Sequence, residues 1–170
     1  MKTIYKYYKS SNSGKIILTT LAIVLSIQAT GNNGARGAIL CSIPQKYNHV
    51  SIYINSIWNE SKACSEKYKI PHALIIAQMC LESSYGRSYH AKNNNHLGIK
   101  FEGKYAKFET LEQCLDVYGR TLSHDKYICF ECQTISCWLW LLDSECYHVG
   151  GNRYTRKVKW IIKTFNLDLI

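Results

Sequence analysis

The sequence predicts an α+β fold that is mainly helical and carries one small β-hairpin. Apolar residues recur at helical spacing in several segments between residues 47 and 165. Residues 98–108 instead alternate between apolar and polar types on both sides of a Glu-Gly pair, which is typical of a hairpin. The length of 170 residues fits a single domain, because about 100–200 residues is the usual size of one core.

The first 29 residues have the pattern of a secretory signal peptide. Four lysines precede an uncharged apolar run at residues 16–29, namely Lys2, Lys6, Lys9 and Lys15. This run is short for a membrane-spanning helix, which needs about 20 apolar residues; an uncleaved N-terminal anchor is the alternative, and we expect no other contact with a membrane. In either case residues 30–44 are expected to be a short linker. Residues 45–170 are expected to be a domain exported to the periplasm, the cell envelope or the medium.

The net charge of +9 is uneven along the chain, because the first acidic residue is Glu60. Without residues 1–29 the chain keeps 17 basic and 12 acidic residues, and its net charge falls to +5. Since the distribution of charge matters more than its size, we expect no nucleic-acid partner. The six histidines show no metal-ligand spacing. We therefore expect no metal and no cofactor, and we expect the histidines at the surface or near the site. The protein is expected to be a monomer.

All eight cysteines follow the signal segment, and an even number in an exported chain favours structural disulfides. The sequence leaves their pairing open. The pair Cys129 and Cys132 has C-x-x-C spacing, so a zinc site and a thiol redox site are the alternatives. The chain lacks the second close pair that zinc favours, and it lacks the βαβ pattern that accompanies a redox motif.

The N-terminal half of the domain is expected to contain two helices followed by the hairpin. Residues 47–69 have a mostly helical apolar pattern. Pro71 falls where the first turn of the next helix tolerates proline. The almost wholly apolar segment 73–81 predicts a buried helix that stops near Gly86. The hairpin then spans residues 98–108.

Three further helices are expected in the C-terminal half. Thr110 and Gln113 form a capping box that opens a helix reaching residue 122. The apolar segment 135–146 precedes a pair of glycines that can end a helix. Asn152 can cap a last helix at about residues 153–165. Three tryptophans at helical spacing are expected in the core: Trp138, Trp140 and Trp160.

Glu82 is the most informative single residue. It lies at the C-terminal end of the apolar segment 73–81. A poorly hydrated carboxyl group keeps its proton to higher pH, so we expect a raised pKa for Glu82. Such a group can act as a general acid by giving a proton to the leaving oxygen of a glycoside. A glutamate at a helix end that points into water is the alternative interpretation.

Four segments, in the right order, resemble the motifs of bacterial endo-β-N-acetylglucosaminidase domains. These are the domains of autolysins and of the flagellar peptidoglycan hydrolase. Residues 70–86 resemble the family's catalytic helix, and residues 94–100 resemble its Asn-Asn-x-Phe-Gly-Ile-Lys signature, with Leu97 in place of Phe. Residues 107–112 resemble the start of its next helix. Tyr147, followed by Asn152-Arg153-Tyr154, resembles the end of the domain, so that the similarity covers about residues 45–168.

This resemblance implies a lysozyme-like fold with a helical lobe, a small β-hairpin lobe and a glycan groove between them. It implies that Glu82 is the catalytic acid and that Tyr147 lines the site beside it. Residues near these positions are then expected to bind the substrate: Ser83, Tyr85, Asn94, Asn95, Tyr127 and Tyr154.

The sequence offers two candidates for the second catalytic group. Many glycosidases use a second carboxylate, and here the short hairpin offers Glu102 at its turn. Glu109 lies just beyond the hairpin and is expected to belong to the helix cap. The substrate's own 2-acetamido oxygen is the alternative nucleophile, in which case no second carboxylate is needed.

Together these patterns predict an exported peptidoglycan hydrolase that cleaves the β-1,4 bond after N-acetylglucosamine. A lysozyme or lytic transglycosylase is one alternative, because that class also carries Glu-Ser at a helix end and uses one glutamate. A non-catalytic cell-wall-binding module is another, because the hairpin is short.

Overall fold

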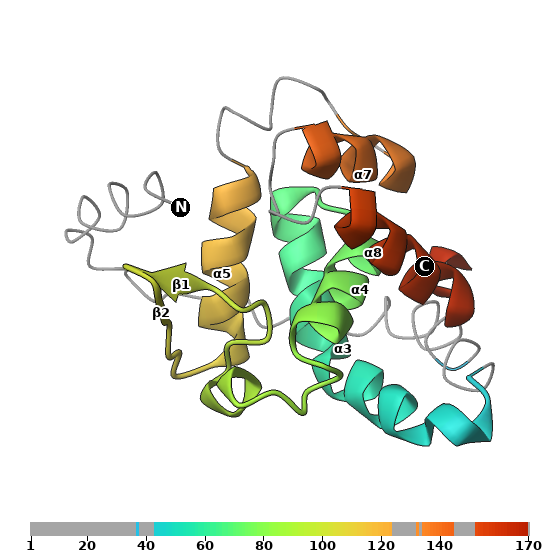
Figure 1. Cartoon of the computed structure of the whole chain (residues 1–170), viewed down its shortest axis with the longest axis horizontal. Coiled ribbons are helices and arrows are strands. Elements are labelled where there is room, and N and C mark those ends of the chain that lie inside the picture. The colour runs from blue at the N-terminus through green and yellow to red at the C-terminus, as the bar shows by residue number, and fades with distance from the viewer. Residues whose placement is uncertain (1–36, 38–42, 124–131, 133, 145–151, 170) are drawn as a thin grey trace, which may run out of the picture.

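The computed structural model describes residues 37, 43–123, 132, 134–144 and 152–169 (Figure 1). The expected signal segment at residues 1–29 lies outside the described residues, as does most of the linker. The elements follow one another as η1 (Gln45–Tyr47), α3 (Asn48–Tyr68), α4 (His72–Glu82), η2 (His90–Asn93), β1 (Lys100–Phe101), β2 (Lys104–Tyr105), α5 (Leu111–Leu122), α7 (Ile135–Ser144), α8 (Asn152–Thr164) and η3 (Leu167–Leu169). The prediction of a mainly helical α+β fold with one hairpin is confirmed. No helix in these described ranges is long and apolar enough to cross a membrane.

Helix α4 lies at the centre of the fold. Eight consecutive residues, 73–80, are buried, so this helix is covered on all sides as an apolar helix must be. Helices α3 and α8 both pack on α4, α5 packs on α3, and α7 packs on α8 (Figure 1). Pro71 is the N-cap of α4, one position before the first turn in which it was expected. Its carbonyl accepts hydrogen bonds from the amides of Leu74 and Ile75, at 3.0 and 3.2 Å.

The hairpin has only two residue pairs, Lys100 with Tyr105 and Phe101 with Lys104. Both loop residues have a left-handed backbone, with φ of 50° at Glu102 and 81° at Gly103. Left-handed conformation at both loop positions is the geometry of the two-residue turn that best matches strand twist. The hairpin is therefore confirmed, with strands shorter than the alternation predicted.

The predicted cap of α5 is confirmed with a small shift. The Gln113 amide donates to the Thr110 hydroxyl at 3.2 Å. The Gln113 side-chain oxygen accepts from the backbone amide of Glu109 at 2.9 Å, one residue before the usual position in a capping box. Glu109 thus belongs to the start of this helix, as expected.

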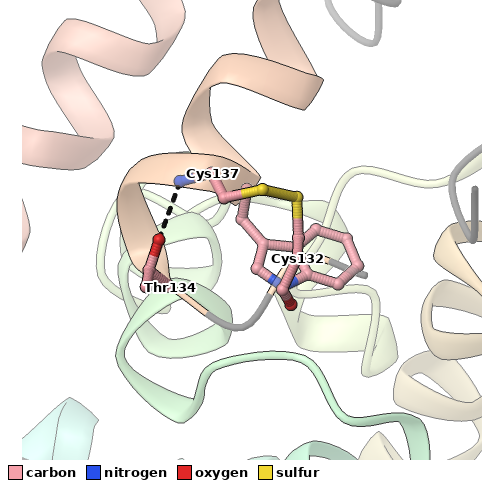
Figure 2. The surroundings of a disulfide bond; sticks show 4 residues. Cys132, Thr134 and Cys137 are labelled. Atoms are coloured by element: carbon pink, nitrogen blue, oxygen red, sulfur yellow. Dashed lines mark hydrogen bonds between the residues drawn. A yellow bond between two sulfur atoms is a disulfide. The ribbon is translucent and has the colours of Figure 1, made fainter. Parts of the chain in front are cut away.

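The cysteines differ from the expectation of a fully disulfide-bonded set. Figure 2 shows the disulfide between Cys132 and Cys137, beside the hydrogen bond from the Cys137 amide to the Thr134 hydroxyl. Cys64, Cys80 and Cys114 are instead buried thiols of the core, so the prediction was wrong for these three. Burial raises the pKa of Cys114 to about 11 and that of Cys64 to about 12. Cysteines 41, 129 and 146 lie outside the described residues.

The tryptophans also divide in two. Trp138 is buried as predicted, but Trp140 is 56% exposed and Trp160 is 53% exposed. Each exposed tryptophan follows a buried residue by two positions, and two positions turn an α-helix by about 200°. The core prediction was therefore wrong for Trp140 and Trp160, because only one face of α7 and one face of α8 meet the core.

Candidate active site

Glu82 is the last residue of α4 and is half-buried, whereas residues 73–80 of the helix are buried in the core. The apolar pattern of 73–81 explains this position, because the helix remains inside the protein until its final turn. A carboxylate thus emerges where the buried helix reaches the surface. Within the described part of the chain, no group of three or more His, Cys, Asp or Glu side chains gathers to hold a metal ion.

The chain turns sharply after Glu82 through three consecutive left-handed residues. Their φ angles are 51° at Ser84, 58° at Tyr85 and 78° at Gly86. Left-handed backbone is strained for residues other than glycine and needs support from its surroundings. Ser83 gives this support: it is fully buried, and its hydroxyl accepts from the Gly86 amide at 2.7 Å and lies 2.6 Å from the Met79 carbonyl.

Tyr53 of α3 connects this turn to the segment before the hairpin. Its hydroxyl lies 2.9 Å from the Ser83 hydroxyl and 2.8 Å from Nδ1 of His96. Burial raises the pKa of Tyr53 far above its usual value, so the phenol keeps its proton. Burial also lowers the pKa of His96, which favours the neutral ring that can accept at Nδ1. The Tyr53–Ser83–His96 network thus fixes the turn after Glu82 against α3.

Gly98 lies directly against the Glu82 carboxylate. A β-carbon at this position would be 3.4 Å from Glu82 Oε2, 3.8 Å from His90 Nε2 and 3.9 Å from the Tyr105 ring. Gly98 has φ of 63°, so a glycine suits both the backbone and the space. Four residues from four different segments therefore meet at one point next to the carboxylate.

His90 joins the end of α4 to the hairpin. Its Nε2 lies 3.2 Å from the backbone carbonyl of Glu82, and since a carbonyl only accepts, the ring nitrogen donates. The His90 ring also stacks on Tyr105 of β2, with centroids 4.4 Å apart and planes at 10°. Lys100 of β1 places its ammonium 4.4 Å from the centre of the same tyrosine ring. The hairpin is thus attached to the Glu82 end of α4 through His90, and the contact of Lys100 with Tyr105 lies within the hairpin.

The paired asparagines hold the base of the hairpin. Asn95 is fully buried; its amide nitrogen donates to the carbonyls of Ile99 and Ala106, and its oxygen accepts from the Ile99 amide, all at 2.8–2.9 Å. Asn94 donates to the carbonyls of Phe108 and Glu109 at 3.1 and 2.9 Å. Asn95 therefore binds backbone on both sides of the hairpin, and Asn94 binds backbone that follows it.

The other predicted site residues lie in different surroundings. Tyr85 is half-buried, with edge contacts to His49 and Phe165. Tyr154 is buried on α8, and its hydroxyl accepts from Gln78 of α4 at 2.9 Å. Glu102 is exposed in the hairpin turn. Tyr127 and Tyr147 lie outside the described residues.

Sequence reasoning did not single out Tyr53 or Tyr105, and it treated His90 only as a residue at the surface or near the site. Tyr53 lies in the apolar pattern of the first helix, where nothing separates it from an ordinary core residue. Tyr105 follows the turn of a hairpin, a position that many sequences fill with an aromatic residue. Their contacts join segments that are far apart in the chain, so local pattern carries no signal for them.

Comparisons with known proteins identify the family and the fold of this chain. The model of the family described as "Mannosyl-glycoprotein endo-beta-N-acetylglucosaminidase" matches residues 58–167. Among solved structures, the catalytic domain of the autolysin Auto from Listeria monocytogenes is similar, with a TM-score of 0.62 and 21% identity. The match covers 88% of this chain and 98% of that one, and it shows that the two share a fold, the lysozyme-like one expected from the sequence. No curated protein matches the chain.

Proposed function

The chain belongs to the glucosaminidase family, and from this premise we propose that it is an exported peptidoglycan hydrolase. The family is one of glycoside hydrolases, and the similar solved structure is the catalytic domain of an autolysin. The proposed bond is the β-1,4 linkage after N-acetylglucosamine. The proposed place of action is the periplasm, the cell envelope or the medium.

The observation that supports catalysis most directly is the setting of Glu82. Its carboxylate stands at the end of a buried helix, and Gly98 presents no side chain on the adjoining side. In the proposed reaction, Glu82 gives its proton to the leaving glycosidic oxygen as the bond to the sugar breaks. The raised pKa expected from the sequence stays a prediction. His90 and the Tyr53–Ser83–His96 network are proposed to position Glu82 and the turn after it.

For the other side of the sugar we propose the substrate's own acetamido oxygen as the nucleophile. This choice is supported by the position of Glu102, which is exposed in a two-residue turn at the far end of the hairpin from Gly98. The acetamido oxygen attacks the anomeric carbon as the leaving group departs, and water then opens the cyclic intermediate with Glu82 acting as the base. Glu102 is the second candidate for this role.

Tyr85 and Tyr147 remain proposed contacts for the sugar rings, and Tyr127 is retained as a proposed contact from the sequence. Four of the predicted site residues are proposed to support the site without touching the substrate: Ser83, Asn94, Asn95 and Tyr154. Their polar atoms bind other parts of the protein, so each shapes the site through the backbone or side chain that it holds.

The test compares Glu82→Gln with Glu60→Gln. The second variant removes an exposed carboxylate of α3 and changes the net charge by the same amount. Glu82→Gln is expected to slow the clearing of purified walls by at least about 100-fold, the usual scale for loss of a general acid. Glu60→Gln is expected to match the wild type. Clearing by Glu82→Gln at the wild-type rate would indicate another catalytic group, and the absence of clearing by the wild type itself would support a binding module.

Mass spectrometry of the products separates the alternative cleavage reactions. Hydrolysis after N-acetylglucosamine leaves that sugar at the new reducing end. A reducing-end N-acetylmuramic acid would instead indicate a lysozyme. A 1,6-anhydro sugar would indicate a lytic transglycosylase.

A further inference from the structure

Helix α8 presents two opposite faces. Its inner face is apolar and buried against the core, with Val158, Ile161 and Ile162 at most 4% exposed. Its outer face carries five cations and one tryptophan, all exposed: Arg153, Arg156, Lys157, Lys159, Trp160 and Lys163. The helix contains no acidic residue. Soluble proteins usually mix positive and negative side chains on a surface. A helix face with charges of one sign therefore suggests a binding partner of the opposite charge.

Four of these residues form a shallow hollow on the outer face, namely Arg153, Arg156, Lys157 and Trp160. They recur at positions i, i+3, i+4 and i+7, which places their side chains along one stripe of the helix. The hollow combines three cationic groups with one flat aromatic ring. On the inner face, the Thr155 hydroxyl donates hydrogen bonds to the carboxylate of Asp143 at 2.8–2.9 Å.

Trp160 is held in place although half of it is exposed. Its ring meets the edge of Phe165 with centroids 6.2 Å apart, and Phe165 meets Tyr85 in the same manner at 6.1 Å. Phe165 is fully buried, so these contacts fix Trp160 on a rigid base. Tyr85 belongs to the turn after Glu82, so a row of aromatic rings joins the α8 face to that turn. The hairpin and α8 nevertheless lie on opposite sides of α3 and α4 (Figure 1).

On the basis of the proposed function, we propose that the outer face of α8 is a second, non-catalytic binding surface for peptidoglycan. The ligand needs a flat sugar ring and several carboxylates close together. A peptidoglycan strand has both, because its sugars carry peptides with free carboxylate groups. A sugar ring stacks on Trp160, while the guanidinium and ammonium groups bind the carboxylates.

A lipid surface fits this face less well. Helices that bind in the plane of a membrane bury an apolar face in it, and the apolar face of α8 is already buried against α4 and α7. Two binding surfaces on one molecule raise its effective concentration at an insoluble polymer without any new contact at the catalytic site. The expected consequence is tighter retention on walls than on short soluble fragments.

The test uses the full mature chain with Glu82→Gln, so that the wall remains intact during binding. The walls are first treated with acid to remove phosphodiester-linked polymers. The triple variant Arg153→Gln, Arg156→Gln and Lys157→Gln is expected to bind these walls at least about tenfold more weakly in sedimentation assays. The matched control replaces three exposed lysines elsewhere with glutamine, namely Lys46, Lys69 and Lys92. Its affinity for the walls is expected to fall by less than twofold.

With Glu82 restored, the triple variant is expected to clear insoluble walls several-fold more slowly. Hydrolysis of a soluble fragment too short to reach both surfaces is expected to change much less. Adding Trp160→Ala to the triple variant is expected to weaken wall binding further. The melting temperature of this variant is measured as well, because Trp160 contacts Phe165.

Three results would overturn the proposal. The triple variant could bind stripped walls as tightly as the control does. Binding could require walls that still carry their phosphodiester polymers, which would identify those polymers as the ligand. Heparin or vesicles of anionic lipid could bind as tightly as stripped walls, which would indicate a general attraction for polyanions. Each result is independent of whether Glu82→Gln abolishes hydrolysis, so the two proposals fail separately.

Discussion

The turn after α4 and the hairpin both approach Glu82, but they are held in place in different ways. The turn has three left-handed residues, and the buried hydroxyl groups of Ser83 and Tyr53 support it from inside the core. The hairpin has two residue pairs and an exposed turn. Its base is fixed by the two asparagines, and its inner side rests on His90.

This difference predicts that the turn after α4 tolerates few substitutions, whereas the tip of the hairpin tolerates many. A larger side chain at Ser83 or Gly86 must disturb buried groups, because Ser83 is itself buried and a β-carbon at Gly86 would meet the buried Tyr53 ring. A change at the tip of the hairpin meets solvent. We therefore expect the consequences of mutation to decrease from the turn, through the contact between the two segments, to the hairpin tip.

Gly86→Ala is expected to have the largest effect. A β-carbon at this position would lie 2.6 Å from Cδ2 of Tyr53, which is buried and hydrogen-bonded, and the φ of 78° is unfavourable for alanine. Overpacking and left-handed strain together are expected to lower the free energy of unfolding by about 3 kcal/mol. Urea denaturation measures this loss. Unchanged stability would show that Tyr53 has more freedom than its hydrogen bonds indicate.

Gly98→Ala tests the point where the two segments meet. The added methyl group would lie 3.4 Å from the Glu82 carboxylate and would occupy the space beside it. We expect wall clearing to fall about tenfold to 100-fold, while stability falls by only about 1 kcal/mol from the left-handed backbone. Gly103→Ala is the matched control, since its φ is 81° and nothing lies within 4 Å of its β-carbon. The control is expected to lose similar stability and to keep its activity.

Local pattern was sufficient to predict α4, the hairpin and the cap of α5. Each depends on residues within one segment: the apolar run 73–81, the Glu-Gly turn, and Thr110 with Gln113. The same reasoning selected Glu82 because its position at the end of an apolar helix can be read directly from the sequence.

The contacts around Glu82 could not be predicted in the same way. Tyr53 reaches His96 across 43 residues, and Asn95 binds Ala106 across 11. The resemblance marked Asn95 as important, but the sequence does not show that its amide holds backbone. The core prediction for Trp140 and Trp160 was wrong for a related reason. Helical spacing alone does not show which face of a helix meets the core.

His90→Phe is expected to have an intermediate effect. Phenylalanine retains a ring that can stack on Tyr105 but removes the donor to the Glu82 carbonyl. One neutral hydrogen bond contributes about 0.5–1.5 kcal/mol, so kcat is expected to fall about twofold to tenfold with little change in KM. His90→Gln retains an N–H donor and is expected to recover part of the loss. Equal losses in both variants, or a loss confined to KM, would argue against a positioning role.

Glu102→Gln is expected to have the smallest effect. Glu102 is exposed in the hairpin turn, and its substitution keeps the size and shape of the side chain. If the substrate's acetamido oxygen is the nucleophile, wall clearing should change by less than about twofold. Assays on the same walls as Glu82→Gln make the comparison direct, with Glu102→Asp as a variant that keeps the charge. A loss of 100-fold in Glu102→Gln, with retention in Glu102→Asp, would instead make Glu102 the second catalytic carboxylate. The hairpin tip would then have to move toward Glu82 when the substrate binds, and the division between a fixed turn and a variable tip would no longer hold.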